Sequence, residues 1–354
     1  MSRVLMKGNE VIGAAAIKAG CKYFFGYPIT PQSELPEYMA VHLPAVGGSF
    51  VQAESEVAAI NMVYGAAACG ARSMTSSSSP GIALKQEGIS FMAAAQLPCV
   101  IVNIARGGPG LGGIQPSQAD YIQATRGGGN GDYHVPVFAP ASLQELAEVI
   151  AYAFEMADRY RNPVMILGDG MLGQMMEAVD LSRIGPGETP EKPWATTGTR
   201  GKRAPNIVNS LYLDPLELEE HSHKLERKYQ VIKQEEWRAQ TDALDGADVV
   251  AVAYGTTARI VRQAQEDLMK EGIKLGLIRP ITLWPFPDPA FDRLDPATKD
   301  LLVVEMSLGQ MVDDVRLANE SRRAIHFTGR TGGMVPTSIQ VADKVREILA
   351  GRRS

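Results

Sequence analysis

The feature of this sequence that most constrains its fold is a regular alternation of short apolar runs with Ala-rich helical patterns between residues 10 and about 180. Strands are expected at KYFFGYP, ARSMTSSSS, LPCVIVNIARG and NPVMILGDG, and helices at EVIGAAAIKAG, SEVAAINMVYGAAACG and SLQELAEVIAYAFEMADRY. Strands that alternate with helices in this way form βαβ units, in which the strands run parallel. The sequence therefore predicts an α/β fold built on a parallel sheet.

The rest of the chain divides into a charged stretch and a second α/β pattern. Residues from about 182 to 245 include LELEEHSHKLERKYQVIKQEEW, a helical segment with few apolar positions, so this region is expected to be a linker or docking arm. From Ala247 the strand-like runs ADVVAVAYG, IKLGLIRP and DLLVVEMS accompany the helical pattern TTARIVRQAQEDLMKEG. Because 354 residues exceed what one ordinary core accommodates, we expect two domains of unequal size.

Charge and cysteine content argue against several classes of function. A formal net charge of −5 does not suit a surface that binds nucleic acid or anionic lipid, since such surfaces need clustered Lys and Arg. The three cysteines form no CxxC pair, so neither a zinc site nor an iron–sulfur ligand set is expected. The start MSRVLMKGNE lacks the pattern of a signal peptide, and no apolar run is long enough to span a bilayer. A cytoplasmic protein is therefore expected.

The segment GYPITPQSELPEYMA, which follows the first predicted strand, holds Thr30 between two prolines. Pro28 and Pro31 fix their own φ angles and disfavour helix at the residue before each, so the chain should leave the strand as a rigid extended turn. Parallel sheets bind ligands at the carboxyl ends of their strands, which makes Thr30 a candidate ligand residue. The alternative is ordinary helix punctuation, with Thr30 as the N-cap and Pro31 in the first turn.

Two further stretches place polar groups at predicted helix starts. Glu54 and Glu56 precede an Ala-rich helix, where either carboxylate would favourably meet the helix dipole. The small residues that follow Glu56 allow close approach, so its carboxylate could also share a proton with a ring nitrogen. In SMTSSSSPG, Ser78 and Ser79 lie where a strand ends and a helix begins, and they form either a cradle for a polar ligand or a flexible, solvated loop.

Arg106 ends the buried run VIVNIA and precedes a glycine-rich stretch, GGPGLGG. A guanidinium at the carboxyl edge of a parallel sheet is well placed to hold a carboxylate in two parallel hydrogen bonds. The alternative is a surface arginine that covers the end of the sheet. The glycines do not have the GxGxxG spacing of a dinucleotide site, and no GxxxxGK[ST] phosphate loop occurs in the sequence.

Together, YPITPQSE, QAESEVAAINMVYGA, MTSSSSPG, ARGGPGLGG and RPITLWPFP resemble the α subunit of the 2-oxoacid:ferredoxin oxidoreductases, which are thiamine diphosphate enzymes. The likeness covers nearly the whole chain. The segments MSRVLMKGNE, LKQEGIS and GGIQPSQADY are most similar to the branched-chain (2-oxoisovalerate) type, with the 2-oxoglutarate type next.

The resemblance implies a role for individual residues. Thr30 corresponds to the threonine that contacts the 2-oxo acid, and Arg106 to the arginine that pairs with its carboxylate. Glu56 corresponds to the catalytic glutamate that hydrogen-bonds the aminopyrimidine ring of thiamine diphosphate. Ser78 and Ser79 are expected near that cofactor, and Tyr27 and Ile29 are expected to contribute an apolar substrate pocket.

The resemblance also implies a division of labour between subunits. Mg²⁺ and the cofactor's diphosphate are expected on a β subunit, and the [4Fe-4S] clusters in β and a small ferredoxin-like subunit, with ferredoxin and coenzyme A as further partners. In this chain LGDGMLGQMME is not followed by the paired asparagines of the magnesium motif, so Asp169 is interpreted as a turn or cap residue and no metal is expected here. His134 is interpreted as structural.

The domains implied are a pyrimidine-binding domain at 1–185, an arm at 186–245 and a smaller transketolase C-terminal-like domain at 246–354. The activity implied is oxidative decarboxylation of a 2-oxo acid with coenzyme A to an acyl-CoA, CO2 and reduced ferredoxin, or the reverse. A nicotinamide-linked dehydrogenase is disfavoured because EVIGAAAIKAG lacks the required fingerprint. A noncatalytic scaffold subunit remains the other alternative, given the charged arm.

Overall fold

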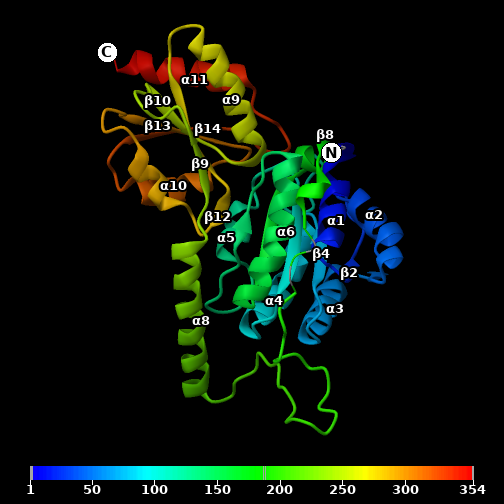
Figure 1. Cartoon of the computed structure of the whole chain (residues 1–354). Coiled ribbons are helices and arrows are strands. Elements are labelled where there is room, and N and C mark those ends of the chain that lie inside the picture. Colours follow the sequence, from blue (N-terminus) through cyan, green and yellow to red (C-terminus); the bar gives the residue numbers. More distant parts are fainter. Residues whose placement is uncertain (1–2, 186, 188, 353–354) are drawn as a thin grey trace.

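A seven-stranded sheet forms the centre of the larger part of the molecule (Figure 1). The structure, a computed structural model, describes residues 3–185, 187 and 189–352. The strand order is β12-β6-β7-β5-β4-β2-β3, and all neighbours run parallel except β12 and β6. The strands are β2 (Tyr23–Gly26), β3 (Ser49–Gln52), β4 (Ser73–Ser77), β5 (Cys99–Ala105), β6 (Val137–Phe138), β7 (Pro163–Asp169) and β12 (Thr282–Trp284).

Helices cover this sheet, and two pairs of them pack on each other. These pairs are α1 (Gly8–Lys18) with α6 (Leu143–Tyr160), and α3 (Glu56–Ala68) with α4 (Ser79–Ala94). Every residue of β5 and β7 is buried, as expected for central strands covered on both faces. The remaining elements of this part are α2 (Glu34–His42), η1 (Pro44–Val46), α5 (Tyr121–Arg126), α7 (Gly170–Gln174), η2 (Leu181–Arg183) and an antiparallel pair, β1 (Val4–Lys7) with β8 (Met176–Val179).

A second sheet forms the smaller part, in the order β14-β13-β10-β11-β9. Its strands are β9 (Ala239–Asp242), β10 (Val249–Val252), β11 (Leu275–Pro280), β13 (Asp300–Glu305) and β14 (Ala324–Gly329), and only β9 is antiparallel to its neighbour. It is accompanied by α9 (Gly255–Met269), α10 (Met311–Asn319), α11 (Ser338–Gly351) and η3 (Asp288–Arg293). Both sheets with their helices confirm the predicted α/β fold.

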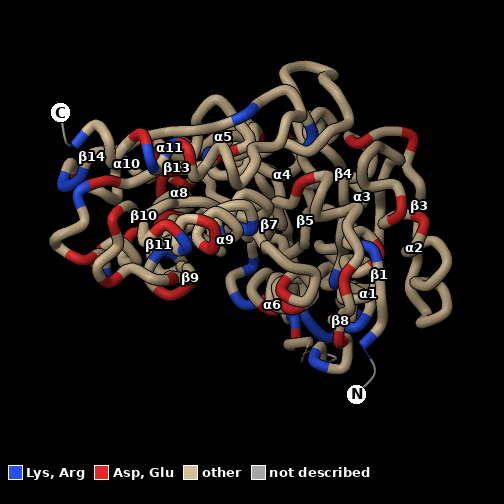
Figure 2. The backbone as a smooth tube through the Cα atoms, turned by 90° about the horizontal axis from the view of Figure 1, so that it is seen from above, with Lys and Arg blue, Asp and Glu red and all other residues tan. Residues whose placement is uncertain are grey.

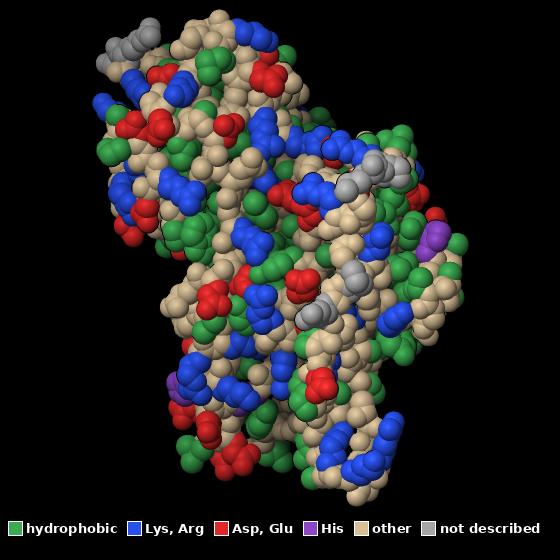
Figure 3. Space-filling model, in the orientation of Figure 1, with side chains coloured by type: hydrophobic (Ala, Val, Ile, Leu, Met, Phe, Trp, Pro, Cys, Tyr) green, Lys and Arg blue, Asp and Glu red, His purple; other side chains and the backbone are tan. Residues whose placement is uncertain are grey.

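The charged stretch forms an arm that includes α8 (Pro215–Glu235), which runs beside the first part of the chain and away from the second sheet (Figure 1). Only Leu225, Tyr229 and Ile232 of this helix are buried. Ile207, Leu213 and Leu216 are among the most exposed apolar side chains, and Figure 3 shows hydrophobic side chains exposed at the lower end of the molecule, where the arm lies. The helical pattern of the arm was therefore predicted correctly.

The two sheets are joined by more than the arm. Strand β12 follows β11 in the chain but pairs with β6 of the first sheet, and β9 pairs with β11 although it precedes residue 246. The sequence pattern does not predict β12 as a strand of the first sheet. A domain boundary at 246 stays a prediction, because strand pairing crosses it on both sides.

Positive and negative side chains are mixed over the molecule, and no large region of the described chain carries one sign of charge (Figure 2). Figure 2 shows Lys and Arg interspersed with Asp and Glu over both parts of the chain. Among the described residues, no helix has the length and apolar character needed to cross a membrane.

Candidate active site

The predicted site residues lie at one edge of the first sheet, where its parallel strands end. The neighbours β5, β4 and β2 are followed by Arg106, by Ser78 and Ser79, and by the loop that contains Thr30. Glu56 begins α3 a few residues after β3, the next strand along. Parallel strand pairing therefore brings together side chains that lie as far as 76 positions apart in the sequence.

Arg106 joins the Thr30 loop to the glycine-rich loop. Its Nη1 donates to the carbonyl of Thr30 at 2.8 Å, and its Nη2 donates to the carbonyl of Leu111 at 3.1 Å. The buried Nε atom has no hydrogen-bond partner. Arg106 is 7% exposed, so the alternative of a surface arginine that covers the sheet does not hold, and the nitrogen Nε remains without a partner for an anionic ligand.

The Thr30 loop does not use its threonine as a helix cap. Helix α2 starts at Glu34, and Ser33 occupies the N-cap position without a side-chain hydrogen bond. Thr30 itself is exposed, and in the described part of the chain its hydroxyl has no partner. Gln32, which is fully buried, accepts from Ser76 Oγ at 2.5 Å while its Nε2 lacks an acceptor. The loop thus points one free hydroxyl outward and leaves one buried donor unsatisfied.

Glu56 is buried at the first position of α3, with 6% of its surface exposed. The N-cap is Ser55, whose hydroxyl accepts from the backbone N–H of Ala58 at 3.2 Å, so Glu56 is not needed to cap the helix. Its Oε1 accepts from Ser77 Oγ at 3.4 Å, a long hydrogen bond. A Cβ on Gly81 would lie 2.4 Å from the same oxygen, so the first turn of α4 closes against the carboxylate.

Ser79 holds the backbone of Arg106 in place. Its hydroxyl accepts from the Arg106 N–H at 2.9 Å and contacts Asp120 Oδ2 at 2.7 Å. Asn103 bridges Ser79 and Asp120, since its Oδ1 accepts from the backbone N–H of Ser79 and its Nδ2 donates to Asp120 Oδ2. Burial raises the pKa of Asp120, while the bonds from Ser79 and Asn103 oppose that rise. Ser78, by contrast, is fully buried, and its hydroxyl has no partner.

The sequence did not identify three residues whose side chains lie at this edge of the sheet: Gln32, Asn103 and Asp120. Asp120 belongs to QPSQADY, and no local pattern marks it as a partner of Ser79. A signal was available for Asn103, because an amide inside the apolar run VIVNIA must be hydrogen-bonded when that strand is buried.

The remaining candidates lie at the rim. Tyr27 is 38% exposed and Ile29 is half-buried, both on the loop after β2. A cavity of about 530 Å³ opens beside Ser79 and Asp120, and Gly108, Gln310 and Thr331 also line it. Residues of both parts of the chain therefore meet next to the predicted site.

Asp169 is a helix cap, as the sequence predicted. Its carboxylate accepts from the backbone N–H groups of Met171 at 2.9 Å and Leu172 at 3.1 Å. In the described part of the chain, no cluster of three or more His, Cys, Asp or Glu side chains is arranged to hold a metal ion.

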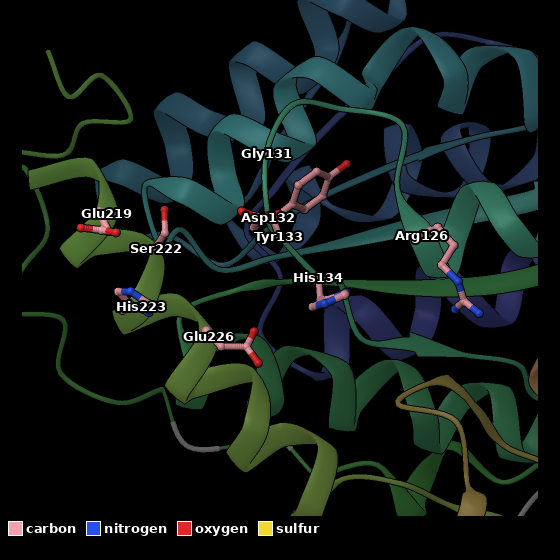
Figure 4. Close-up of a pocket in the computed structure, with 9 residues that line it drawn as sticks. All are labelled: Arg126, Gly131, Asp132, Tyr133, His134, Glu219, Ser222, His223 and Glu226. Atoms are coloured by element: carbon pink, nitrogen blue, oxygen red, sulfur yellow. The ribbon is translucent and has the colours of Figure 1, made fainter. Parts of the chain in front are cut away.

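A larger cavity, of about 620 Å³, lies elsewhere, between α8 and the segment 131–134 (Figure 4). None of the seven predicted site residues lines it. His134 at its wall stacks on Trp284, with ring centroids 4.6 Å apart, which agrees with a structural role. Size alone therefore does not identify the active site.

Comparison with known proteins places the chain in a family. Residues 14–236 match the family model described as pyruvate flavodoxin/ferredoxin oxidoreductase, thiamine diphosphate-binding, and residues 247–341 match pyruvate:ferredoxin oxidoreductase core domain II. The ketoisovalerate oxidoreductase subunit VorB of Methanothermobacter thermautotrophicus is 47% identical over 98% of both chains. The 2-oxoglutarate synthase subunit KorA of Methanocaldococcus jannaschii is 35% identical over 93% of this chain and 95% of its own length.

Solved structures agree with this assignment. The 2-oxoglutarate:ferredoxin oxidoreductase from Magnetococcus marinus superposes with a TM-score of 0.84 at 28% identity, over 98% of this chain and 65% of that one. A split-gene transketolase shares the fold alone, with a TM-score of 0.61 at 17% identity. From the matched models and relatives, this chain belongs to the family of 2-oxoacid:ferredoxin oxidoreductase subunits.

Proposed function

We propose that this chain is the α subunit of a 2-oxoacid:ferredoxin oxidoreductase that acts on branched-chain 2-oxo acids such as 3-methyl-2-oxobutanoate. The reaction is oxidative decarboxylation with coenzyme A to acyl-CoA, CO2 and reduced ferredoxin, or the reverse. The observation that carries the proposal is the meeting of Glu56, Arg106 and the Thr30 loop at one sheet edge, in a chain 47% identical to a ketoisovalerate oxidoreductase subunit.

The residues at this edge fit thiamine diphosphate. Ser78 Oγ, Gln32 Nε2 and Arg106 Nε are buried polar atoms without partners, and such atoms normally find one. Gly81 lets the first turn of α4 pack closely on Ser77 and Glu56, because a Cβ there would lie 2.0 Å from Ser77 Oγ. Ser78 and Glu56 would hold the pyrimidine half of the cofactor. When bound, thiamine diphosphate supplies the nucleophilic carbon that attacks the 2-oxo group.

Each residue then has a separate task. Glu56 holds a proton at the pyrimidine ring nitrogen, which its buried position favours by excluding water. Arg106 offers Nε to the substrate carboxylate, and release of the Leu111 carbonyl would free a second donor for a two-point contact. Thr30 offers its hydroxyl to the oxygen atoms of the 2-oxo acid, and Ser79 with Asp120 fixes the backbone from which Arg106 projects.

Substrate preference is assigned to the rim. Tyr27 and Ile29 are apolar, and they suit an alkyl tail better than a second carboxylate, which calls for an additional cation. The identity to 2-oxoglutarate synthase subunits makes 2-oxoglutarate the second candidate substrate.

The proposal requires partner subunits. Mg²⁺, the diphosphate group and the [4Fe-4S] clusters are assigned to a β subunit and a small ferredoxin-like subunit, with ferredoxin as electron acceptor in the cytoplasm. Helices α3 and α4, which begin at the site, expose Val57, Met62, Leu84 and Phe91. Adjoining apolar side chains of this kind favour protein contact. We therefore propose that the β subunit covers these helices, where it would complete the cofactor site.

The test is viologen reduction by the co-purified complex with coenzyme A across a panel of 2-oxo acids. We expect 3-methyl-2-oxobutanoate to give the highest kcat/KM, and the isolated chain to be inactive. Preference for 2-oxoglutarate would replace the substrate assignment and leave the reaction class intact. No reduction with any 2-oxo acid would contradict the enzymatic proposal and favour a scaffold subunit.

A further inference from the structure

Lys85 is a buried cation in the helix that begins at the proposed site. Its side chain is fully buried in α4, and its Nζ donates to Thr75 Oγ1 at 2.8 Å. Lysine is almost never fully buried unless its charge is paired. The chemistry proposed for Glu56, Arg106 and Thr30 does not use this residue.

Helix geometry puts Lys85 one turn from Gly81, the residue of α4 that faces the carboxylate of Glu56. Gly81 and Lys85 are four residues apart, so they lie on one face of α4, one turn apart. Gly81 is the residue whose Cβ would touch Glu56 Oε1. On β4, Thr75 and Ser77 likewise share a face, and Ser77 bonds Glu56 while Thr75 bonds Lys85. The pairs Ser77–Glu56 and Thr75–Lys85 therefore form two adjacent layers between α3, β4 and α4.

Charge links the two layers. Burial lowers the pKa of Lys85 to about 8, and the carboxylate of Glu56 opposes that shift. The carboxylate of Glu56 acts on the Lys85 ammonium, and the face of β4 that holds Lys85 carries the hydroxyls of Ser73, Thr75 and Ser77. A buried carboxylate and a buried ammonium would each be costly without the other.

We propose that Lys85 is a positioning residue for Glu56: its buried ammonium, held by Thr75, compensates the charge of the buried carboxylate and fixes it where the pyrimidine of the cofactor would bind. This inference rests on the proposed function of Glu56. Lys85 itself touches neither cofactor nor substrate, because its side chain is enclosed by protein.

The test uses three variants of the assembled complex: Lys85→Met, Lys85→Gln and Lys85→Arg. Calorimetric titration of the cofactor-free complex with thiamine diphosphate and Mg²⁺, in two buffers of different ionisation enthalpy, gives both the affinity and the number of protons taken up. Binding that takes up a proton weakens as pH rises, and with the charge removed this decline should begin at a pH higher by about one unit or more. On that alkaline side the affinity should then be on the order of tenfold higher than in the wild-type complex, with less proton uptake near neutral pH.

Two comparisons separate charge from packing. Lys85→Gln keeps a hydrogen-bond donor for Thr75 but not the charge, so it should behave like Lys85→Met, whereas Lys85→Arg should keep the wild-type profile. Lys228→Met, which removes a lysine on α8 whose pKa burial also lowers, should leave the profile unchanged. Wild-type proton uptake in Lys85→Gln, or an equal shift in Lys85→Arg, would overturn the proposal.

Glu56→Gln distinguishes this inference from the proposed function. If that variant is inactive and the Lys85 variants bind cofactor as wild type does, only the role of Lys85 fails. If Glu56→Gln is fully active, the proposed function of Glu56 fails. In a Glu56→Gln background, Lys85→Gln should cause no further shift of the profile, because the coupled partner is absent.

Discussion

At the scale of the residue, Glu56 differs from Glu54, two positions earlier, in the burial of its side chain. Both precede or begin α3, but Glu56 is enclosed against Ser77 and Gly81 while Glu54 is exposed. Glu56→Gln removes the group that exchanges the proton, so kcat for viologen reduction by the complex should fall by roughly 10²–10⁴-fold. The fold should persist, because Gln has the same shape and the helix cap is Ser55.

Glu54→Gln is the matched control. It makes the same chemical change two positions away at the surface, and kcat should remain at the wild-type value. Unchanged activity in Glu56→Gln, with normal cofactor content, would favour a scaffold role for this chain.

At the scale of the element, the first turn of α4 is fitted to the carboxylate that it faces. A methyl group at Gly81 would lie 2.0 Å from Ser77 Oγ and 2.4 Å from Glu56 Oε1, so Gly81→Ala must displace one of them. We expect a loss of about 1–3 kcal/mol in unfolding free energy, as for other overpacked sites, and weaker thiamine diphosphate binding by the complex. Denaturant unfolding and calorimetric titration measure the two effects.

Gly65→Ala on α3 provides the opposite case. A Cβ at Gly65 meets nothing within 4 Å, so this variant should gain roughly 0.5–1 kcal/mol from helix propensity alone. If both glycine variants were stabilised, α4 would not be as close to the carboxylate as the structure indicates.

At the scale of the whole molecule, Gln118 ties the first part of the chain to the second. Its Nε2 donates to the Tyr254 carbonyl at 2.9 Å, and its Oε1 accepts from the Met306 N–H at 2.9 Å and from Thr257 Oγ1 at 3.2 Å. Gln118→Leu would leave buried backbone groups unpaired, each at about 1–3 kcal/mol. We expect the unfolding free energy to fall by roughly 2–4 kcal/mol in denaturant unfolding.

Gln263 provides the matched control for Gln118. It is exposed, and its amide makes one long contact to Glu266 at 3.4 Å. Gln263→Leu should change the unfolding free energy by less than about 0.5 kcal/mol. Equal effects in the two variants would mean that the Gln118 network does not hold the parts together.

The candidate site could be predicted in outline because its residues follow strands. Arg106, Ser78 and the Thr30 loop come directly after runs whose apolar character marks them as strands, and parallel strands end at a common edge. The motifs also carried the family resemblance, which the matched family models confirm. Partners of these residues were not predictable, since Asp120 reaches Ser79 across 41 positions and no local pattern records that contact.

The sequence by itself determined the parallel α/β fold, the charged helical arm and the residue types at the site, because hydropathy period and proline placement act locally along the chain. Only the tertiary structure decided that β12 joins the first sheet and that Lys85 is buried on Thr75, one helical turn from the glycine that faces Glu56. From the segment LKQEGIS alone, Lys85 would be expected to be solvated on a helix, and its burial depends on which elements pack around it. Packing is a property of the whole fold, so the charge that accompanies Glu56 is visible only in three dimensions.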